Sequence, residues 1–386
     1  MNFSWYTDCK FTTGKTIHQC DMKTKIFLCG DVMTGRGIDQ ILPEPSLPRI
    51  YEPYIKDASD YVRLAEEKNG QISSPVDYRY IWGDALEKIR DPDIDFRLIN
   101  LETSITHSNN FWRGKGINYR MNPENIHCIT AAGINCCSLA NNHVIDWGYE
   151  GLKETLFTLE KAQILHTGAG DNIYEAQKPA RFSSPGKRRI LIFGIGSSSS
   201  GIPYEWAAED RKAGVNTIFN LSAETANQTA DLINAEKDQN DIVIISIHWG
   251  ENWGYNIPLV QKAFAHTLID LTGASIIHGH SSHHVKGLEV YNGALILYGC
   301  GDFINDYEGI LGYEEFRAEL TFLYLVVLNG SGKFESCKMV PMHQMNFRLQ
   351  QPSKDDISWL IRLYRTKNSI EGAQLVLCET GCLEII

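Results

Sequence analysis

The chain has 386 residues, of which 43% are hydrophobic and 22% charged, the balance of an ordinary soluble globular protein. Its formal net charge is −11, from 36 basic and 47 acidic residues, and no run of five basic residues occurs, so a nucleic-acid-binding surface is disfavoured. Because the cysteines form no CxxC pair, the first residues lack a secretory signal and the longest apolar run is short, we expect a cytoplasmic protein with no membrane span.

Short apolar runs that read as buried strands recur along the chain, and several are separated by helical patterns. The predicted strands are Lys25–Cys29, Phe96–Leu101, Asn135–Ala140, Arg189–Ile195, Asp241–Ile247, Ala274–Ile277 and Ala294–Tyr298. Helical spacing predicts helices at Gly151–Ala162, Ser222–Glu236 and Asp355–Arg365. Strands that alternate with helices predict an α/β fold.

Two hairpins are predicted in the second half of the chain. The first joins Val285–Val290 to Ala294–Tyr298 through an Asn-Gly turn, and the second joins Leu320–Leu328 to Lys333–Val340. Since no linker-like stretch is present, we expect one main domain.

Polar residues of metal-binding type follow five of the predicted strands. They are Asp31, Glu102, the Asn141-Asn142-His143 run with Asp146, His248, and the His278–His284 segment HGHSSHH. An open α/β sheet places its ligand crevice at such strand ends. Carboxylate, amide and imidazole groups suit two divalent ions about 3.5 to 4 Å apart, which would activate a water for attack.

The segments GDVMTGRG, NLETSIT, ANNHVIDWG, HWGENW, GHSSHHV and LYGCGDFIND together resemble the motif series of the poly-γ-glutamate capsule-synthesis (CapA) family, within the calcineurin-like metallophosphoesterase superfamily. The resemblance covers about residues 24–345. It implies a four-layer α/β/β/α sandwich with two mixed sheets and a dinuclear metal site at the strand ends. By this resemblance, 1–23 is an N-terminal extension, 24–345 is the CapA-like domain and 346–386 is a C-terminal helical extension.

The resemblance also implies roles for individual residues. The metal ligands would be Asp31, Glu102, Asn142, His248, His280 and His284, binding Mn, Fe, Zn or Mg. His143 would be the general acid and Asp146 would orient its imidazole. Arg120 and Arg36 are the candidates for recognising an anionic substrate.

The chain departs from the superfamily pattern at two points. Met33 stands where the superfamily has a histidine ligand, which predicts a weaker or vacant first metal site. Ser281 and Ser282 stretch the last motif, so that either His283 or His284 could be its second ligand, and the His284-Val285 step favours His284.

The resemblance implies a metal-dependent hydrolase acting on a phosphoester or a related anionic bond, in a small molecule or a polymer. Two alternatives stay open at this point. The chain could be a non-catalytic accessory protein that binds poly-γ-glutamate during its synthesis or export, or a degenerate scaffold, as the Met33 change would allow.

Overall fold

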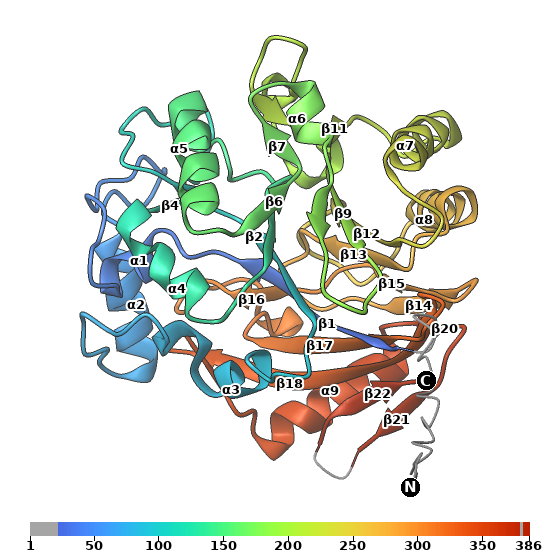
Figure 1. The fold of residues 1–386 in the computed structure, drawn as a ribbon. Helices are drawn as coiled ribbons and strands as arrows, with labels where there is room; N and C mark the ends of the chain where they lie inside the picture. Colours follow the sequence, from blue (N-terminus) through green and yellow to red (C-terminus); the bar gives the residue numbers. More distant parts are fainter. Residues whose placement is uncertain (1–21, 379–380) are drawn as a thin grey trace, which may run out of the picture.

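The computed structural model describes residues 22–378 and 381–386, which form a mixed α/β fold around two large sheets (Figure 1). The prediction of an α/β chain is therefore confirmed. The predicted N-terminal extension lies almost wholly outside the described residues.

The first sheet has ten strands. Its main path runs β21 (Leu375–Leu377), β22 (Leu383–Ile385), β18 (Phe334–Met345), β17 (Leu320–Leu328), β1 (Thr24–Val32), β2 (Phe96–Leu101), β5 (Cys136–Ser138) and β6 (Leu165–Thr167). Two more strands lie off this path: β16 (Asp302–Ile304) pairs with β1, and β19 (Arg348–Gln350) pairs with β18. The β17–β18 pair is the second predicted hairpin.

The second sheet has eight strands. Its path runs β11 (Thr217–Ile218), β9 (Ile190–Ser197), β12 (Ile242–His248), β13 (Ile276–His280), β15 (Ala294–Leu297), β14 (Leu288–Tyr291) and β20 (Ile370–Glu371), and β8 (Ala180–Phe182) pairs with β9. The antiparallel β14–β15 pair is the first predicted hairpin, and Asn292 in its turn has a positive φ of 48°. Two smaller pairs complete the sheets: β3 (Ser104–Ile105) with β4 (Arg120–Met121), and β7 (Ala169–Gly170) with β10 (Gly214–Val215).

Alternate residues of the central strands pack on opposite sides. In β1, Leu28 lies in a core shared by both sheets, together with Ile244 of β12, whereas Phe27 packs on the outer side. Because successive strand residues point to opposite faces, each sheet is buried on both sides, which explains the continuous apolar runs in the sequence.

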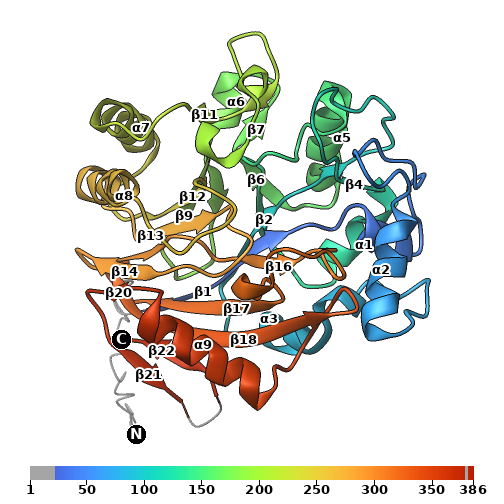
Figure 2. The same ribbon diagram turned by 180° about the vertical axis from the view of Figure 1, so that it is seen from behind.

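Helices pack against both sheets. The long helices are α2 (Ser59–Asn69), α5 (Gly148–Lys161), α7 (Ala223–Glu236), α8 (Leu259–Thr272) and α9 (Lys354–Thr366), and the short ones are α1 (Gly37–Ile41), α3 (Leu86–Ile89), α4 (His127–Thr130) and α6 (Ile173–Gln177). Helices such as α5, α7 and α8 cover the outer faces of the sheets, whereas α9 packs against the core that both sheets share. Helices α7 and α8 lie side by side over the second sheet, and α5 lies over the first, as both ribbon views show (Figures 1 and 2). The three helices predicted from the sequence correspond to α5, α7 and α9.

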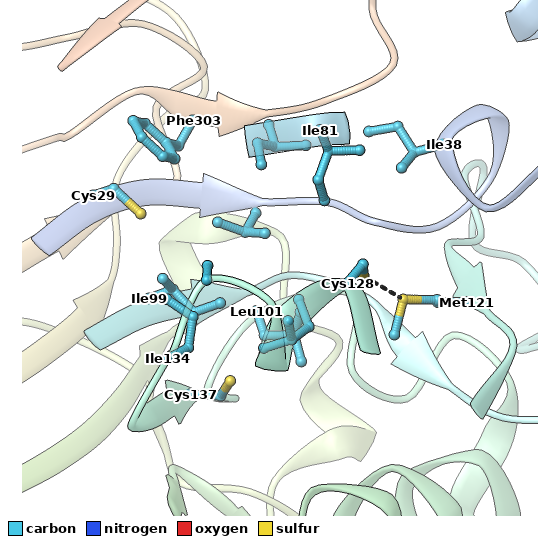
Figure 3. Close-up of a cluster of buried hydrophobic side chains, with 14 of the residues drawn as sticks. Cys29, Ile38, Ile81, Ile99, Leu101, Met121, Cys128, Ile134, Cys137 and Phe303 are labelled. Atoms are coloured by element: carbon cyan, nitrogen blue, oxygen red, sulfur yellow. Dashed lines mark hydrogen bonds between the residues drawn. The ribbon is translucent and has the colours of Figure 1, made fainter. Parts of the chain in front are cut away.

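The outer core of the first sheet is closed by residues from distant parts of the chain. Figure 3 shows Ile99 and Leu101 of β2 facing this cluster, with Phe303 of β16 and Ile81 beside β1. The sulfur atoms of Cys128 and Met121 lie 3.7 Å apart within it. This packing fixes the strands whose ends carry the polar residues described below.

Strand β1 changes its neighbour along its length. Its first half pairs with the antiparallel strand β17, and its end pairs with the parallel strand β16, opposite Asp302. The change occurs at Gly30, where an added Cβ would lie 1.6 Å from the carbonyl oxygen of Gly301. The chain that leaves the second sheet after β15 thus joins the first sheet next to Asp31.

The C-terminal residues contribute to both sheets. Helix α9 begins with a capping box in which Ser353 and Asp356 bond to each other's backbone N–H groups. After it, β20 pairs with β14, and β22 pairs with β18. In the described part of the chain, no helix is both long and apolar enough to cross a membrane.

Candidate functional site

The predicted polar residues meet where the ends of the strands of both sheets converge. Asp31 lies near the end of β1, and Glu102 follows β2 in the same sheet. His248 and His280 are the last residues of the neighbouring parallel strands β12 and β13 in the other sheet, and they are register partners. All four side chains are buried. The site is therefore shared between the two sheets.

Three of these side chains form a group with the spacing of a metal site. One ligand atom each of Asp31, His248 and His280 lie within 4.8 Å of one another. The Nδ1 atoms of the two histidines are 2.8 Å apart, and His280 Nδ1 lies 3.8 Å from Asp31 Oδ1. Asn142 adjoins the group, with its Oδ1 3.1 Å from His248 Nε2.

A chain of hydrogen bonds determines which nitrogen of His280 carries the proton. His278 Nε2 lies 2.7 Å from the carbonyl oxygen of Cys29, which only accepts, so His278 donates from Nε2 and its Nδ1 is an acceptor. The Ser246 hydroxyl donates to that Nδ1 over 3.1 Å, and its oxygen accepts from His280 Nε2 over 2.9 Å. His280 therefore keeps an unprotonated Nδ1 on the side of Asp31.

Three carboxylates are buried together at the site: Asp31, Glu102 and Asp302. Asn100 donates from Nδ2 to both Asp31 Oδ1, at 2.7 Å, and Glu102 Oε2, at 3.2 Å. Burial and the charge of Asp302 raise the pKa of Asp31 to about 7. Burial and the charge of Asp31 also raise the pKa of Glu102 well above its usual value. The positive groups whose charges act on these carboxylates, His283 and Lys115, are fewer than the carboxylates themselves.

The predicted acid His143 lies at the edge of this group. Its Nε2 is 3.7 Å from Glu102 Oε1, and its Nδ1 is 2.6 Å from Asp146 Oδ2. Lys115 contacts both members of this pair: its Nζ forms an ion pair with Asp146 and lies 2.9 Å from His143 Nδ1. Burial, followed by the charge of Lys115, lowers the pKa of His143 to about 4.

Of the two alternatives in the last motif, His283 is the residue next to the carboxylates. Its Nδ1 lies 3.0 Å from Asp302 Oδ1, and this carboxylate raises the pKa of His283 even though burial lowers it. The Nδ1 of His284 instead faces its own backbone neighbour, the carbonyl of Val285, and its ring packs against Trp253, Tyr255 and Phe316. Ser281 has a positive φ of 101°, which turns the chain so that its N–H donates to Asp31 Oδ2 over 3.1 Å. The structure therefore corrects the preference for His284.

Neither arginine proposed for anion recognition has a free guanidinium. Arg36 is buried, forms an ion pair with Asp306 and donates to Glu52 over 3.0 Å. Arg120 donates to the carbonyls of Ser108 and Leu47 and lies 3.9 Å above the ring of Trp147. These contacts belong to ion pairs and loop anchors within the protein, and they leave the guanidiniums paired before any ligand binds.

Sequence reasoning overlooked several residues at the site: Asn100, Lys115, Ser246 and Asp302. Asn100 and Ser246 stand two positions before Glu102 and His248, and this period of two would have placed them on the same strand faces. Asp302 lies within a quoted motif, but its partner Asp31 is distant in sequence. Lys115 belongs to a loop without any regular pattern.

A comparison with protein families assigns most of the described chain to one family. Residues 25–307 match the model described as "Bacterial capsule synthesis protein PGA_cap". The chain belongs to this family. The family prediction made from the strand-end motifs is thereby confirmed, and the matched range contains every site residue discussed above.

Several curated relatives match over most of their length. A protein of Mycobacterium tuberculosis named "Probable polyglutamine synthesis accessory protein" is 43% identical over 363 residues, which is 94% of this chain and 95% of the relative. The "PGA biosynthesis protein CapA" of Bacillus subtilis is 27% identical over 79% of this chain and 68% of its own. The "Capsule biosynthesis protein CapA" of Bacillus anthracis is 23% identical over 92% of this chain and 76% of its own.

Proposed function

We propose that this member of the capsule-synthesis family is a metal-dependent hydrolase of the metallophosphoesterase type, which acts on a phosphoester or a related anionic bond. The observation that carries the proposal is the convergence of Asp31, His248 and His280 from two sheets onto one point. The names of the relatives add a link to poly-γ-glutamate metabolism as the setting of this activity.

The donor set fits divalent cations. The hydrogen-bond chain through Ser246 leaves His280 Nδ1 unprotonated, as a metal ligand must be. The three buried carboxylates repel one another, and a divalent ion would supply the positive charge that they lack. Imidazole and carboxylate ligands accept Mn, Fe, Zn or Mg, and the choice depends on geometry and supply.

We propose two ion positions for this arrangement. Asp31, His248, His280 and the amide oxygen of Asn142 would hold one ion, and Glu102 would lie between the two. In the second position, Asp302 would supply the ligand that Met33 does not, together with His283. Bound ions of this kind lower the pKa of a coordinated water to about 7 and offset charge on the substrate oxygens.

The residues of the chain itself would act on the leaving group. His143 points Nε2 toward Glu102, and its other nitrogen faces Asp146 and Lys115, so the ring is held on one side and free to give a proton on the other. Asp146 in turn accepts the backbone N–H of Tyr119 over 2.6 Å, which fixes the carboxylate.

Metal analysis combined with a substrate screen tests this proposal. We expect purified protein to bind divalent ions and to hydrolyse aryl phosphates or phosphodiesters, and His280→Ala to lose both properties. His107→Ala is a matched control, because His107 is exposed and pairs with Glu154 outside the site. Folded wild-type protein that takes up no Mn, Fe, Zn or Mg after reconstitution would contradict the proposal. The screen should include γ-glutamyl amides.

A second candidate is a non-catalytic accessory protein that binds poly-γ-glutamate. The observations in its favour are the word "accessory" in the name of the M. tuberculosis relative and the Met33 change. This candidate predicts polymer binding that survives both His143→Ala and His280→Ala. Loss of polymer binding in these variants, together with turnover by the wild type, would favour the hydrolase instead.

A further inference from the structure

A cavity of about 610 Å³ opens beside the candidate metal site. His283 lines it and also contacts Asp302, so one imidazole connects the cavity with the buried carboxylates. The segment after β16 forms one wall and approaches α2, where Glu308 bonds to Asn69 (Figure 2). A substrate whose reacting group sits among the strand ends therefore has room for its remaining part in this cavity.

The charged residues that line the cavity make it acidic. They are the cations Arg36 and Lys68, the imidazole of His283, which is paired with Asp302, and the carboxylates Glu52, Glu308, Glu314 and Glu319. Arg36 is already matched by Asp306 and Glu52, and Glu319 by Arg317.

The remaining lining charges still favour negative potential. Glu308 accepts the backbone N–H groups of Asn346 and Phe347 rather than pairing with a cation, and Glu314 is exposed. Lys68, also exposed, is the one lining cation in the described chain for which no ion pair is found. A carboxylate of a ligand would therefore be repelled by Glu308 and Glu314.

Five aromatic side chains contribute to the remaining wall, beside aliphatic and amide groups: Tyr54, Tyr61, Trp253, Tyr307 and Tyr313. Trp253 and Tyr313 stack with ring centroids 4.0 Å apart and planes 4° apart, and Tyr307 packs edge-on against His283 at 5.1 Å. Tyr313 is 47% exposed and Tyr54 is 98% exposed, so both have ring surface free for a ligand. Aromatic faces next to carboxylates favour flat apolar groups, and cations above all.

We propose that this cavity binds the organic part of the substrate, and that this part is an uncharged or cationic group with an aromatic or apolar face rather than a chain of carboxylates. The assignment as a substrate subsite rests on the proposed hydrolytic function. It also implies that a poly-γ-glutamate chain does not thread through this cavity, since the polymer carries a carboxylate on every residue.

Binding of three probes of equal size tests the proposal without any turnover. Benzylamine, benzyl alcohol and benzoate differ mainly in charge. Their affinities are measured by ligand-observed NMR titration of the metal-loaded protein in saturating inorganic phosphate, so that the carboxylate of benzoate does not bind the metal ions. We expect benzylamine to bind most tightly and benzoate about tenfold more weakly, with tri-γ-glutamate no tighter than benzoate. Equal affinities, or tightest binding of benzoate or of tri-γ-glutamate, would overturn the proposal.

Two exposed variants locate the binding in the cavity. Tyr313→Ala should weaken benzylamine binding about tenfold. The control Tyr204→Ala should not, because Tyr204 is an exposed tyrosine that packs at a tilt against Phe219 outside the cavity. Glu314→Lys should reduce the difference in affinity between benzylamine and benzoate. If Tyr313→Ala and Glu314→Lys leave all three affinities unchanged, the probes bind elsewhere and the proposal fails.

A kinetic comparison separates this inference from the hydrolase proposal. If the enzyme hydrolyses phosphomonoesters, kcat/KM for benzyl phosphate should exceed that for glycerol phosphate about tenfold, and Tyr313→Ala should reduce that ratio. The expected probe order without any turnover would support the cavity assignment and count against hydrolysis. Turnover with no preference among probes or substrates would support hydrolysis and count against the cavity assignment.

Discussion

Lys115 lies where it can affect proton transfer by His143 without touching the candidate metal ligands. Its ammonium group joins Asp146 and the Nδ1 side of the His143 ring. Replacing it by Met leaves Asp146 to hold this nitrogen and removes a charge that lowers the pKa of His143. We expect the loss of orientation to outweigh the rise in this pKa, so protonation of the leaving group should suffer. We expect Lys115→Met to slow the hydrolysis of alkyl phosphates about tenfold or more and that of nitrophenyl phosphate very little. The reason is that only a basic leaving group needs protonation by the general acid.

Steady-state kinetics on a series of leaving groups measures this effect. Lys115→Arg should restore part of the rate, and Arg113→Met, an exposed neighbour in the same loop, serves as the control. A uniform loss across all leaving groups would show that Lys115 supports the fold and not the acid.

Asp31 should make the stability of metal-free protein depend on pH. In the unfolded chain this carboxyl titrates near 3.8, whereas in the folded protein its pKa is raised to about 7. Between these values the folded state holds a proton that the unfolded state has released, so Asp31 lowers the free energy of unfolding as pH rises from about 4 to about 7. The slope is at most about 1.4 kcal/mol per pH unit.

Denaturant titrations of metal-free wild type and Asp31→Asn over this pH range isolate the contribution. The variant should gain stability relative to the wild type as pH rises. Parallel pH profiles of the two proteins would show that Asp31 is ionised throughout.

Individual site residues were predictable from the sequence where they end a strand. Asp31, Glu102, His248 and His280 each follow an apolar run that has to be buried, and parallel strands bring such ends together. The choice between His283 and His284 was not predictable, because it depends on the positive φ of Ser281. The ion pair of Arg36 was likewise not predictable from the sequence, since its partner Asp306 lies 270 residues away.

Strand β1 depends on a glycine at the point where its neighbour changes. A Cβ on Gly30 would lie 1.6 Å from the carbonyl oxygen of Gly301, and backbone atoms have little room to move. We expect Gly30→Ala to lower the free energy of unfolding by about 3 kcal/mol or more. Chemical denaturation measures this, with Gly116→Ala as the control because no atom lies within 4 Å of its Cβ position.

If Gly30→Ala were as stable as the control, the close approach of β1 to the segment before β16 would be wrong. The metal affinity of the Gly30→Ala variant should fall as well, because the close approach of these two segments brings Asp302 opposite Asp31.

Several long elements followed from local patterns, although the long helices α2 and α8 were not predicted, and short elements did not follow from such patterns. Helix α7 begins at a Ser222 cap and buries one stripe of side chains, and β12 is a run of apolar residues. Both elements can therefore be predicted from the local sequence. Strand β16 has three residues, and it pairs with the part of β1 that lies beyond the last β1–β17 pair, Leu28 with Tyr324. Pairing between residues so far apart in sequence leaves no local pattern.

Cation binding should stabilise the whole molecule, because its ligands come from both sheets. Asp31 and Glu102 belong to one sheet, and His248 and His280 to the other. At a free-ion concentration of about 100 times Kd, a single site adds about 2.7 kcal/mol to the free energy of unfolding. We expect a chelator to lower the melting temperature of wild type and of His107→Ala, and to leave His280→Ala unchanged in scanning calorimetry.

The packing of the two sheets was predictable only through the family resemblance. Apolar runs indicate strands buried on both faces, but they do not say which sheet a strand joins. The two sheets share an apolar core that includes Leu98 of β2 and Ile276 of β13. A chelator without effect on stability would mean that this core alone holds the sheets together.

The shared edge of β1 also restricts how a ligand reaches the site. Two hydrogen bonds join β1 to the end of β13 in the other sheet. His278 Nε2 donates to the carbonyl of Cys29 over 2.7 Å, and the N–H of Ser281 donates to Asp31 Oδ2 over 3.1 Å. A hinge that parted the sheets at this edge would break these bonds. Substrate exchange should therefore proceed through the cavity lined by His283, without separation of the two sheets. The affinity of a ligand should then include no free-energy cost of closing the protein around it.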